Sequence, residues 1–422
     1  MADGVLHLSS LVGSPLLDSA NERVGRVDDV VARLDDGDAL PLVVGLRALI
    51  GGRNLFVPAR NIAQLDGDGA RLSTTKVNLA QFERRPNEIV LRGDVLGHSV
   101  INVNTARLVT AGEVELVCEE GTWRVAGIDT SFGARVRRHL PRALRGGGAA
   151  ADEEESFVAW TELEPFVGHV PTARLRLRHR RIAHLHPSQI ADLVEAATHD
   201  EGEEILAAVG QDKELEADVF EELDDEHQLE FLNERSDREV ASVLGRMASD
   251  DAADLLLEIK QERRVPVLEL LPATKQRKIR KLLGYNPSTA GGVMSPDFVS
   301  VPAAGTAADA IAAARKLDLP PEALHTILLT ERGGALAGLV SAGVVLAADP
   351  QTPLLELAVT SPPAVGADAD VPEVARLMTD YNLVSLPVVD DDERPLGIVS
   401  VDDILELMLP EDWRRRYGLA RE

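Results

Sequence analysis

The sequence has a single cysteine, Cys118, among 422 residues, and this scarcity excludes an intramolecular disulfide and any metal site built from several thiolates. Cys118 lies in the alternating stretch Val114–Cys118, which predicts a packed thiol on a strand. Aromatic residues make up only 3% of the chain while 45% of it is hydrophobic, so its cores must consist mainly of Leu, Val, Ile and Ala.

Long apolar runs are also missing from the sequence. No stretch of about 18 apolar residues occurs, so no helix is expected to insert into a membrane. The N-terminal residues do not combine a basic segment with a following apolar run, which excludes a secretory signal peptide. These two absences predict a soluble protein in the cytoplasm.

Positive charge is scarce, because 44 Lys and Arg face 70 Asp and Glu, for a net charge of −26. Such a chain repels nucleic acid and anionic lipid at long range, so neither is expected as a partner. Clustered carboxylates attract hard divalent cations, which bind through oxygen. The alternative is that the acidity only keeps the protein in solution.

Short Val- and Leu-rich runs separated by turn signals, from residue 10 to about residue 83, predict a small β-barrel. Its segments Val12–Asp18, Arg23–Val30 and Leu55–Pro58 resemble the PRC-barrel family. A second, weaker copy extends from Asp94 to Leu116. PRC-barrels are adaptor modules in otherwise unrelated proteins, so this resemblance implies interaction and not chemistry.

The central part of the chain has a repetitive helical pattern. After a Gly-rich and acidic linker at Arg145–Glu155, apolar pairs recur about every dozen residues from Ile182 to Leu283. Turns at Ser236-Asp237 and Ser249-Asp250 supply N-caps for the helices that follow. Helices this short cannot bury their apolar faces alone, so they are expected to stack into a superhelix.

The C-terminal part is an internal duplication in which each copy alternates strand, helix, strand, strand and helix. One copy begins near Met294 and the other near Val359. This order resembles the CBS module, two of which pair into one disc.

In CBS modules a Gly, a hydroxyl residue and an Asp at a strand-to-helix turn hold a nucleotide, and the second copy keeps Gly397, Ser400 and Asp403. The alternative is that Ser400 only caps the last helix. The first copy has Val344 in place of the Asp. Thr326 and Leu383 stand where nucleotide-binding relatives have aromatic residues, so adenine nucleotide is not expected to bind.

The helical repeat, the segment Tyr285–Met294 and the CBS pair together resemble the cytosolic region of the MgtE magnesium channel family. The resemblance covers residues 185 to 410. It does not extend to the five-helix membrane pore of that family. It implies Mg²⁺ between carboxylates of the helical domain and the CBS pair. The matching positions are Asp218, Asp250, Asp254, Asp370 and Asn382.

Two positions depart from this pattern, because Pro372 and Asn382 replace expected acids. An Asn still offers a carbonyl oxygen to an ion, whereas Pro offers no side-chain ligand. The alternative for Asp250 and Asp254 is that they complement the positive end of a helix dipole.

The predicted fold is multidomain, with an N-terminal all-β part, a central all-α superhelical repeat and a C-terminal α+β CBS pair. The expected boundaries are 1–85 for the PRC-barrel-like domain, 86–143 for a second such module, 144–158 for a linker, 159–287 for the helical domain, 288–410 for the CBS pair and 411–422 for a tail.

No local set of catalytic residues appears, so an enzyme is not expected. The preferred hypothesis is a magnesium-responsive regulator or adaptor that forms a homodimer through its CBS pair and docks a membrane metal transporter. The alternatives are a soluble subunit of a magnesium transport system and a non-catalytic scaffold.

Overall fold

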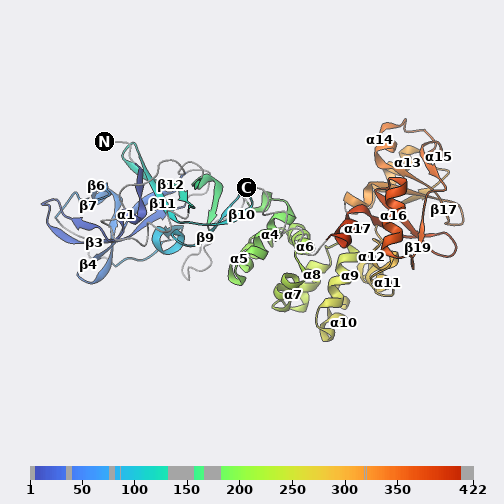
Figure 1. The fold of residues 1–422 in the computed structure, drawn as a ribbon, viewed down its shortest axis with the longest axis horizontal. Coiled ribbons are helices and arrows are strands. Elements are labelled where there is room, and N and C mark those ends of the chain that lie inside the picture. The colour runs from blue at the N-terminus through green and yellow to red at the C-terminus, as the bar shows by residue number, and fades with distance from the viewer. Residues whose placement is uncertain are drawn as a thin grey trace. The chain divides into compact units, whose positions relative to one another are not determined.

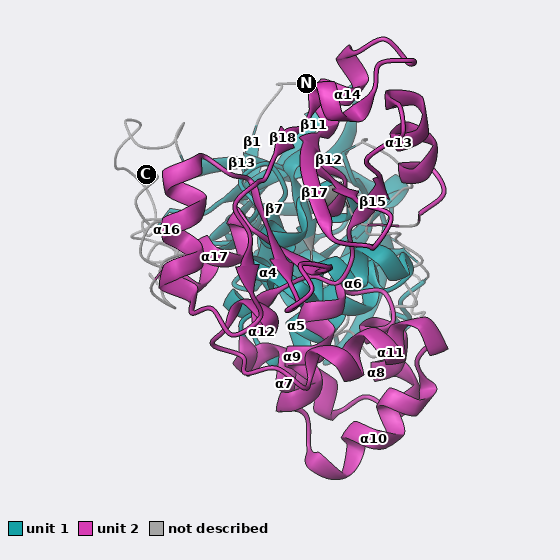
Figure 2. Ribbon diagram, turned by 90° about the vertical axis from the view of Figure 1, so that its right-hand side faces the viewer, with its two compact units in different colours: residues 1–224 teal, residues 225–422 magenta. Residues whose placement is uncertain are grey.

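The computed structural model describes residues 5–34, 40–75, 81–85, 87–131, 156–165, 182–317, 319 and 321–409. The expected tail at 411–422 and most of the expected linker lie outside these ranges. The described chain forms two compact units, residues 1–224 and 225–422 (Figures 1 and 2).

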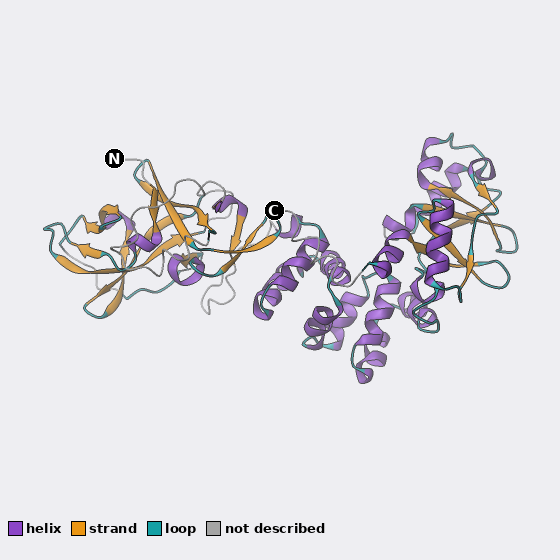
Figure 3. Ribbon diagram, viewed as in Figure 1, coloured by secondary structure: helices purple, strands orange, loops and turns teal. Residues whose placement is uncertain are grey.

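The first unit begins with a nearly closed β barrel, drawn in orange in Figure 3. Its main sheet has the order β1-β11-β12-β4-β3-β2-β7-β6, with β13 on β12, β5 on β4 and β8 on β3, and a smaller sheet has the order β10-β9-β14. The strands are β1 (Val5–His7), β2 (Pro15–Leu17), β3 (Arg23–Arg33), β4 (Leu42–Ile50), β5 (Arg53–Pro58), β6 (Ile62–Asp66), β7 (Gly69–Leu72), β8 (Glu88–Val90), β9 (Ser99–Asn102), β10 (Arg107–Thr110), β11 (Glu113–Glu119), β12 (Thr122–Asp129), β13 (Phe157–Ala159) and β14 (Leu163–Pro165).

Strands from both halves of this region share one sheet and one core. β1 pairs with β11 and β3 pairs with β8, so the sheet crosses the boundary expected at residue 85. Buried side chains such as Leu8, Leu46, Leu116 and Trp160 belong to a single hydrophobic cluster. The region therefore folds as one β unit, and Trp160 contributes to its core from beyond the segment expected as a linker.

The buried carboxylate of Asp29 links β3 to a π-helical turn at Leu91–Val95. Asp29 accepts hydrogen bonds from the backbone amides of Val30 (2.8 Å), Arg92 (2.7 Å) and Gly93 (3.1 Å). The guanidinium of Arg47 lies 3.4 Å from the same carboxylate. Burial is the largest effect and raises the pKa of Asp29 to about 6, although these partners oppose the rise.

Short helices follow the barrel, drawn in purple in Figure 3. The first unit holds α1 (Leu8–Leu11), α4 (Pro187–Ala196), α5 (His199–Val209) and α6 (Lys213–Glu222). The second unit holds α7 (Asp225–Asn233), α8 (Asp237–Leu244), α9 (Ser249–Glu258), α10 (Gln261–Leu270), α11 (Ala273–Leu282) and α12 (Ala290–Val293).

The caps of these helices follow the sequence prediction in part. Ser236 is the N-cap of α8, as its sequence predicts, and the structure adds a capping box with Glu239. In α9 the N-cap is Ala248, so Ser249 lies inside the helix and its buried hydroxyl is used elsewhere. Arg263 joins helices of the second unit, because it donates to Asp237 (2.7 Å) and to the carbonyl of Arg235 (2.6 Å).

The two CBS copies have the same topology, which confirms the duplication read from the sequence. In the first copy β15 (Val299–Pro302) is parallel to β16 (Thr326–Thr330), which is antiparallel to β17 (Leu336–Ser341). In the second, β19 (Val365–Gly366), β20 (Ser385–Val389) and β21 (Pro395–Ser400) repeat this arrangement. The remaining elements are β18 (Val359–Thr360), α13 (Ala307–Ala314), α14 (Ala342–Ala347), α15 (Leu354–Leu357), α16 (Val371–Tyr381) and α17 (Val401–Met408).

The segment that connects α11 to the CBS pair is closely packed. A Cβ at Gly292 would lie 2.2 Å from the carbonyl oxygen of Asn286, and a Cβ at Gly291 would lie 2.7 Å from the ring of Tyr285. The amides of Ala290 and Gly291 donate to carbonyls of the second CBS copy. Both glycines are therefore required by the close approach of neighbouring groups.

Candidate functional site

Carboxylates gather where α9 and α11 meet the CBS pair within the second unit. The junction is defined here by Ser249, Asp250, Lys278, Asp297 and Asp403. Asp250 is half-buried in the first turn of α9, and its Oδ1 is buried without a hydrogen-bond partner among the described residues.

The charges around Asp250 make it an uncompensated acid. Burial raises the pKa of Asp250 well above its usual range, and the negative charges of Asp251, Asp403 and Asp297 raise it further. Asp251 adjoins it on α9, whereas Asp403 and Asp297 belong to the CBS pair. Acids from both sides of the junction therefore repel one another in the absence of a bridging cation.

Asp297 has partners of its own and is only 7% exposed. Its Oδ2 accepts a 2.7 Å hydrogen bond from the hydroxyl of Ser249. Its Oδ1 forms an ion pair with the ammonium group of Lys278 on α11. The chain itself thus supplies partners to this carboxylate, a cation among them, unlike that of Asp250.

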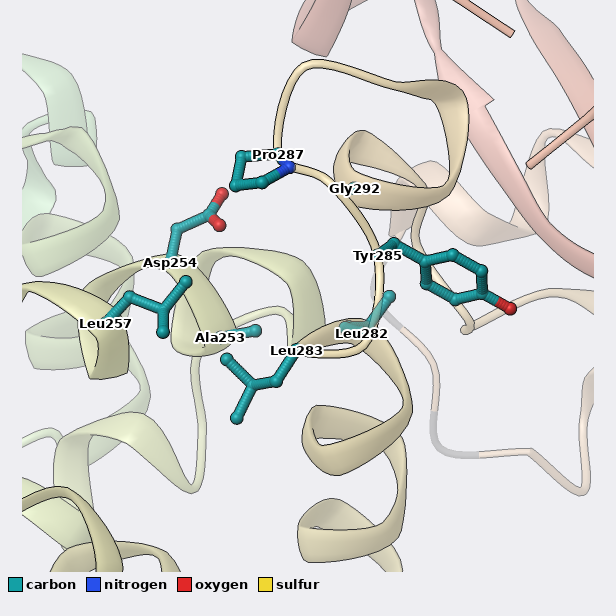
Figure 4. A pocket seen from close by; sticks show the side chains of 8 residues that line it. All are labelled: Ala253, Asp254, Leu257, Leu282, Leu283, Tyr285, Pro287 and Gly292. Carbon is teal, nitrogen blue, oxygen red and sulfur yellow. The ribbon is translucent and has the colours of Figure 1, made fainter. Parts of the chain in front are cut away.

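Asp254 lies one turn further along α9 and lines a shallow pocket with Leu257, Leu282, Tyr285 and Pro287. Its carboxylate points toward Pro287 (Figure 4). The residue is exposed, yet desolvation by the surrounding groups is the main cause that raises the pKa of Asp254 to about 6, and the charge of Asp225 adds to it. Desolvation, with the charges of Asp225 and Asp254, also raises the pKa of the neighbouring Glu258.

The two predicted ligands on the CBS side lie at opposite ends of α16. Asp370 is the N-cap and accepts a 2.9 Å hydrogen bond from the amide of Glu373. Asn382 is the C-cap and has a left-handed backbone conformation, with φ of 52°. Twelve residue steps at 1.5 Å place these positions roughly 18 Å apart, so one ion cannot bind both. Both side chains are exposed.

The remaining predicted metal ligand, Asp218, lies on α6 of the first unit with an exposed side chain. Asp250 and Asp254 share one helix of the second unit and are four residues apart, so they lie on the same side of α9. Of the five predicted metal residues, the structure thus brings Asp250 and Asp254 together on one helix.

The predicted nucleotide residues have structural partners. A Cβ at Gly397 would lie 2.6 Å from the carbonyl oxygen of Ser295, so this glycine admits the close approach of the segment at Ser295. Ser400 caps α17, and its amide donates to the carboxylate of Asp403 at 3.1 Å, which completes a capping box. Ser400 therefore caps α17 in the structure, as the alternative interpretation of its sequence expected.

Sequence reasoning missed three members of the junction. Asp403 was predicted as a nucleotide residue, and its proximity to Asp250 depends on the packing of α17 near α9. Asp297 and Lys278 carried no motif, although the basic sequence of α11, with Lys275, Lys278 and Lys281, stands out in so acidic a chain. This contrast between a basic helix and an acidic chain was the sequence feature that could have drawn attention to these residues.

Comparisons with known proteins confirm the expected resemblance. Residues 185–288 match the MgtE intracellular N domain, residues 354–410 match the CBS domain and residues 3–79 match the PRC-barrel domain. Within the described residues, no helix has the length and apolar character needed to cross a membrane.

Two curated relatives are both named magnesium transporter MgtE. The protein of Thermus thermophilus is 31% identical over 198 residues, which are 46% of this chain and 44% of that protein. The protein of Bacillus subtilis is 28% identical over 194 residues, which are 46% of this chain and 43% of that protein. The chain thus spans less than half the length of the curated relatives it matches.

A solved structure described as the soluble part of a magnesium transporter is 24% identical, with a TM-score of 0.50. The similarity covers 54% of this chain and 90% of that structure. It shows that the helical region and the CBS pair share the fold of that protein.

Proposed function

We propose that this protein is a non-catalytic, magnesium-responsive regulator located in the cytoplasm, in which a divalent ion bridges α9 and the CBS pair. The observation that carries this proposal is the buried Oδ1 of Asp250, which has no hydrogen-bond partner among the described residues and is repelled by acids of both sides of the junction. The named magnesium transporters that match the chain support the choice of ion.

The donor set fits a hard divalent cation. Asp250, Asp251 and Asp403 supply only carboxylate oxygens, the ligands that Mg²⁺ binds directly or through its water shell. Asp254, with its raised pKa, is the proposed second position on α9. We keep Asp218, Asp370 and Asn382 as proposed outer positions, each exposed on its own element. Bound Mg²⁺ would supply positive charge and nothing else.

The energies are large enough for a switch. Two carboxylates about 4 Å apart repel by roughly 4 kcal/mol at an effective dielectric constant of 20. A cation between them changes the sign of this interaction. A change of about 5.5 kcal/mol moves a two-state equilibrium from 1:99 to 99:1, so one or two such pairs suffice.

The proposed partners are a second copy of the chain and a membrane magnesium transporter. Exposed apolar side chains on and after α16 and α17, including Tyr381 (59%), Leu405 (54%) and Met408 (63%), support a homodimer through the CBS pair. The barrel, as an adaptor, is the proposed docking module for the transporter. Adenine nucleotide has no role in this proposal.

Small-angle scattering of the full chain with and without millimolar Mg²⁺, with Na⁺ and Ca²⁺ as controls, tests the magnesium response. We expect compaction with Mg²⁺ that is lost in the double variant Asp250→Asn/Asp254→Asn. Identical scattering profiles with and without Mg²⁺ would overturn the proposal and leave a plain scaffold.

A second candidate function is a soluble subunit that takes part in magnesium flux only when assembled with a membrane pore. It is favoured by the share of the curated transporters that the chain covers, 44% and 43%. Stable, stoichiometric co-purification with a transporter from native membranes would favour this candidate. Magnesium-dependent and reversible association would favour the regulator.

A further inference from the structure

Three lysines of α11 contact the segments around the junction. Lys275, Lys278 and Lys281 follow one another at intervals of three residues, so they lie along one side of the helix. Lys275 donates to the carbonyl of Met247, just before α9, and Lys281 donates to the carbonyl of Leu396 at 3.4 Å. Lys278, between them, binds Asp297.

The central contact is the most enclosed of the three. Asp297 is 7% exposed and Ser249 is fully buried, whereas the side chain of Lys278 is 38% exposed. A buried carboxylate is costly unless it is paired and hydrogen-bonded. Ser249 and Lys278 provide both kinds of partner from α9 and α11, so the docking of the CBS pair on these helices buries Asp297 without leaving it unpaired.

We infer that Lys278 is a built-in cation of the junction, which holds α9 and α11 against the CBS pair through Asp297 without a divalent ion. Lys278 is a positioning residue, because its ion pair is with Asp297 and, among the described residues, it forms none with Asp250. The regulatory role of Lys278 rests on the proposed function. Because Lys278 pairs with Asp297, a divalent ion would bind at Asp250 and Asp403.

The junction is then divided into two parts. The part around Asp297 has a cation of the chain, Lys278, at every magnesium concentration. The part around Asp250 keeps its excess negative charge until a cation arrives. Lys278 thereby limits how far the junction opens when magnesium is withdrawn and lowers the concentration at which it closes again.

Hydrogen–deuterium exchange of the full chain, in EDTA and across a Mg²⁺ titration, tests this inference through peptides that cover α9, α11 and residues 294–299. The variant Lys278→Gln removes the built-in cation. Arg280→Gln is the matched control, because Arg280 lies on the same helix, is exposed and changes the net charge equally. Lys278→Arg retains the charge.

In EDTA we expect Lys278→Gln to lose about tenfold in protection at residues 294–299 and to need several-fold more Mg²⁺ to regain it. Arg280→Gln and Lys278→Arg should behave like the wild type. Equal protection of Lys278→Gln and Arg280→Gln in EDTA would overturn the inference. If Lys278→Gln does not fold, unchanged protection in Asp297→Asn would overturn it, and lost protection would support it.

The two proposals fail separately in this experiment. If Mg²⁺ alters exchange in no variant but Lys278→Gln exchanges faster in EDTA, the magnesium response fails while Lys278 keeps its role. If Mg²⁺ protects the wild type but Lys278→Gln matches Arg280→Gln throughout, the role of Lys278 fails and the magnesium response remains.

Discussion

The hydroxyl of Ser249 donates a 2.7 Å hydrogen bond to the carboxylate of Asp297, 48 residues further along the chain. The bond joins the first turn of α9 to the segment that precedes β15. Both residues are buried, so neither finds water as a substitute partner. The docking of the CBS pair on the helical segment is therefore sensitive to single atoms at this point.

Ser249→Ala should weaken the junction, because it leaves Asp297 with one fewer partner in a buried place. The expected loss is about 1–3 kcal/mol, the cost of a buried hydrogen bond to a charged group. Exchange protection of residues 294–299 measures it. Ser288→Ala, an exposed serine on the connecting segment, serves as the control and should change nothing. Equal effects of the two substitutions would contradict the prediction.

Asp250→Asn should tighten the junction in EDTA, because it removes a negative charge that burial and neighbouring acids destabilise. We expect protection of α9 and α17 to rise by about tenfold, on the order of 1.4 kcal/mol. The same variant should respond less to Mg²⁺. A drop in protection in EDTA would show instead that the ionised Asp250 stabilises the closed arrangement.

Magnesium binding near Asp254 should weaken as the solution is acidified. The pKa of this carboxylate is raised to about 6, so it is mostly ionised at pH 7 and mostly protonated at pH 5, and the proton competes with the cation. Calorimetric titration with Mg²⁺ at both pH values measures the change. Asp254→Asn should bind more weakly at pH 7 and lose much of the pH dependence. Parallel pH profiles of variant and wild type would contradict this prediction.

The barrel should become more stable on mild acidification through Asp29. Its folded-state pKa of about 6 lies above the unfolded value, so the folded state binds the proton more tightly and gains stability as pH falls from about 7 to about 4. The rise of roughly two pKa units corresponds to about 3 kcal/mol. Exchange of the Arg92 and Gly93 amides, corrected for the intrinsic rate, reports it.

Asp29→Asn is the matched variant for that measurement, because it keeps the shape and removes the titration. Its amide exchange at Arg92 and Gly93 should vary less with pH than that of the wild type. An unchanged pH dependence in Asp29→Asn would assign the effect to another group.

The apolar surface on α16 and α17 should determine the oligomeric state. Leu405→Asp places a charge among exposed apolar side chains and should convert a dimer into a monomer, as measured by size-exclusion chromatography with light scattering. Val265→Asp, on the equally exposed Val265 of α10, is the control and should leave the dimer intact. A monomeric wild type would refute the proposed dimer.

Local patterns in the sequence predict much of this fold. The helical repeat, the N-cap at Ser236 and the CBS duplication all follow from residues close together in the chain. Strand pairings such as β1 with β11 join segments more than a hundred residues apart, so no local periodicity reveals them and the expected division at residue 85 does not appear in the sheet.

The candidate site also has residues that the sequence predicts and residues that only the structure reveals. Asp250 and Asp254 were predicted from the resemblance, and desolvation, with added repulsion from neighbouring acids, raises the pKa values of both. The pairing of Lys278 with Asp297 depends on how α11 packs, and Ser249 gave a misleading signal because a serine before an acid is typical of an N-cap. Tertiary contacts decide these roles.

Residues Thr130 and Ser156 lie side by side, since both the amide and the hydroxyl of Thr130 donate 3.0 Å hydrogen bonds to the carbonyl of Ser156. β13 then pairs with β12 within the same sheet. The chain positions on either side of residues 132–155 are thus adjacent on the barrel. A fluorescent protein or an affinity handle whose own termini lie close together can be spliced in there, giving a reporter that leaves the strand order undisturbed.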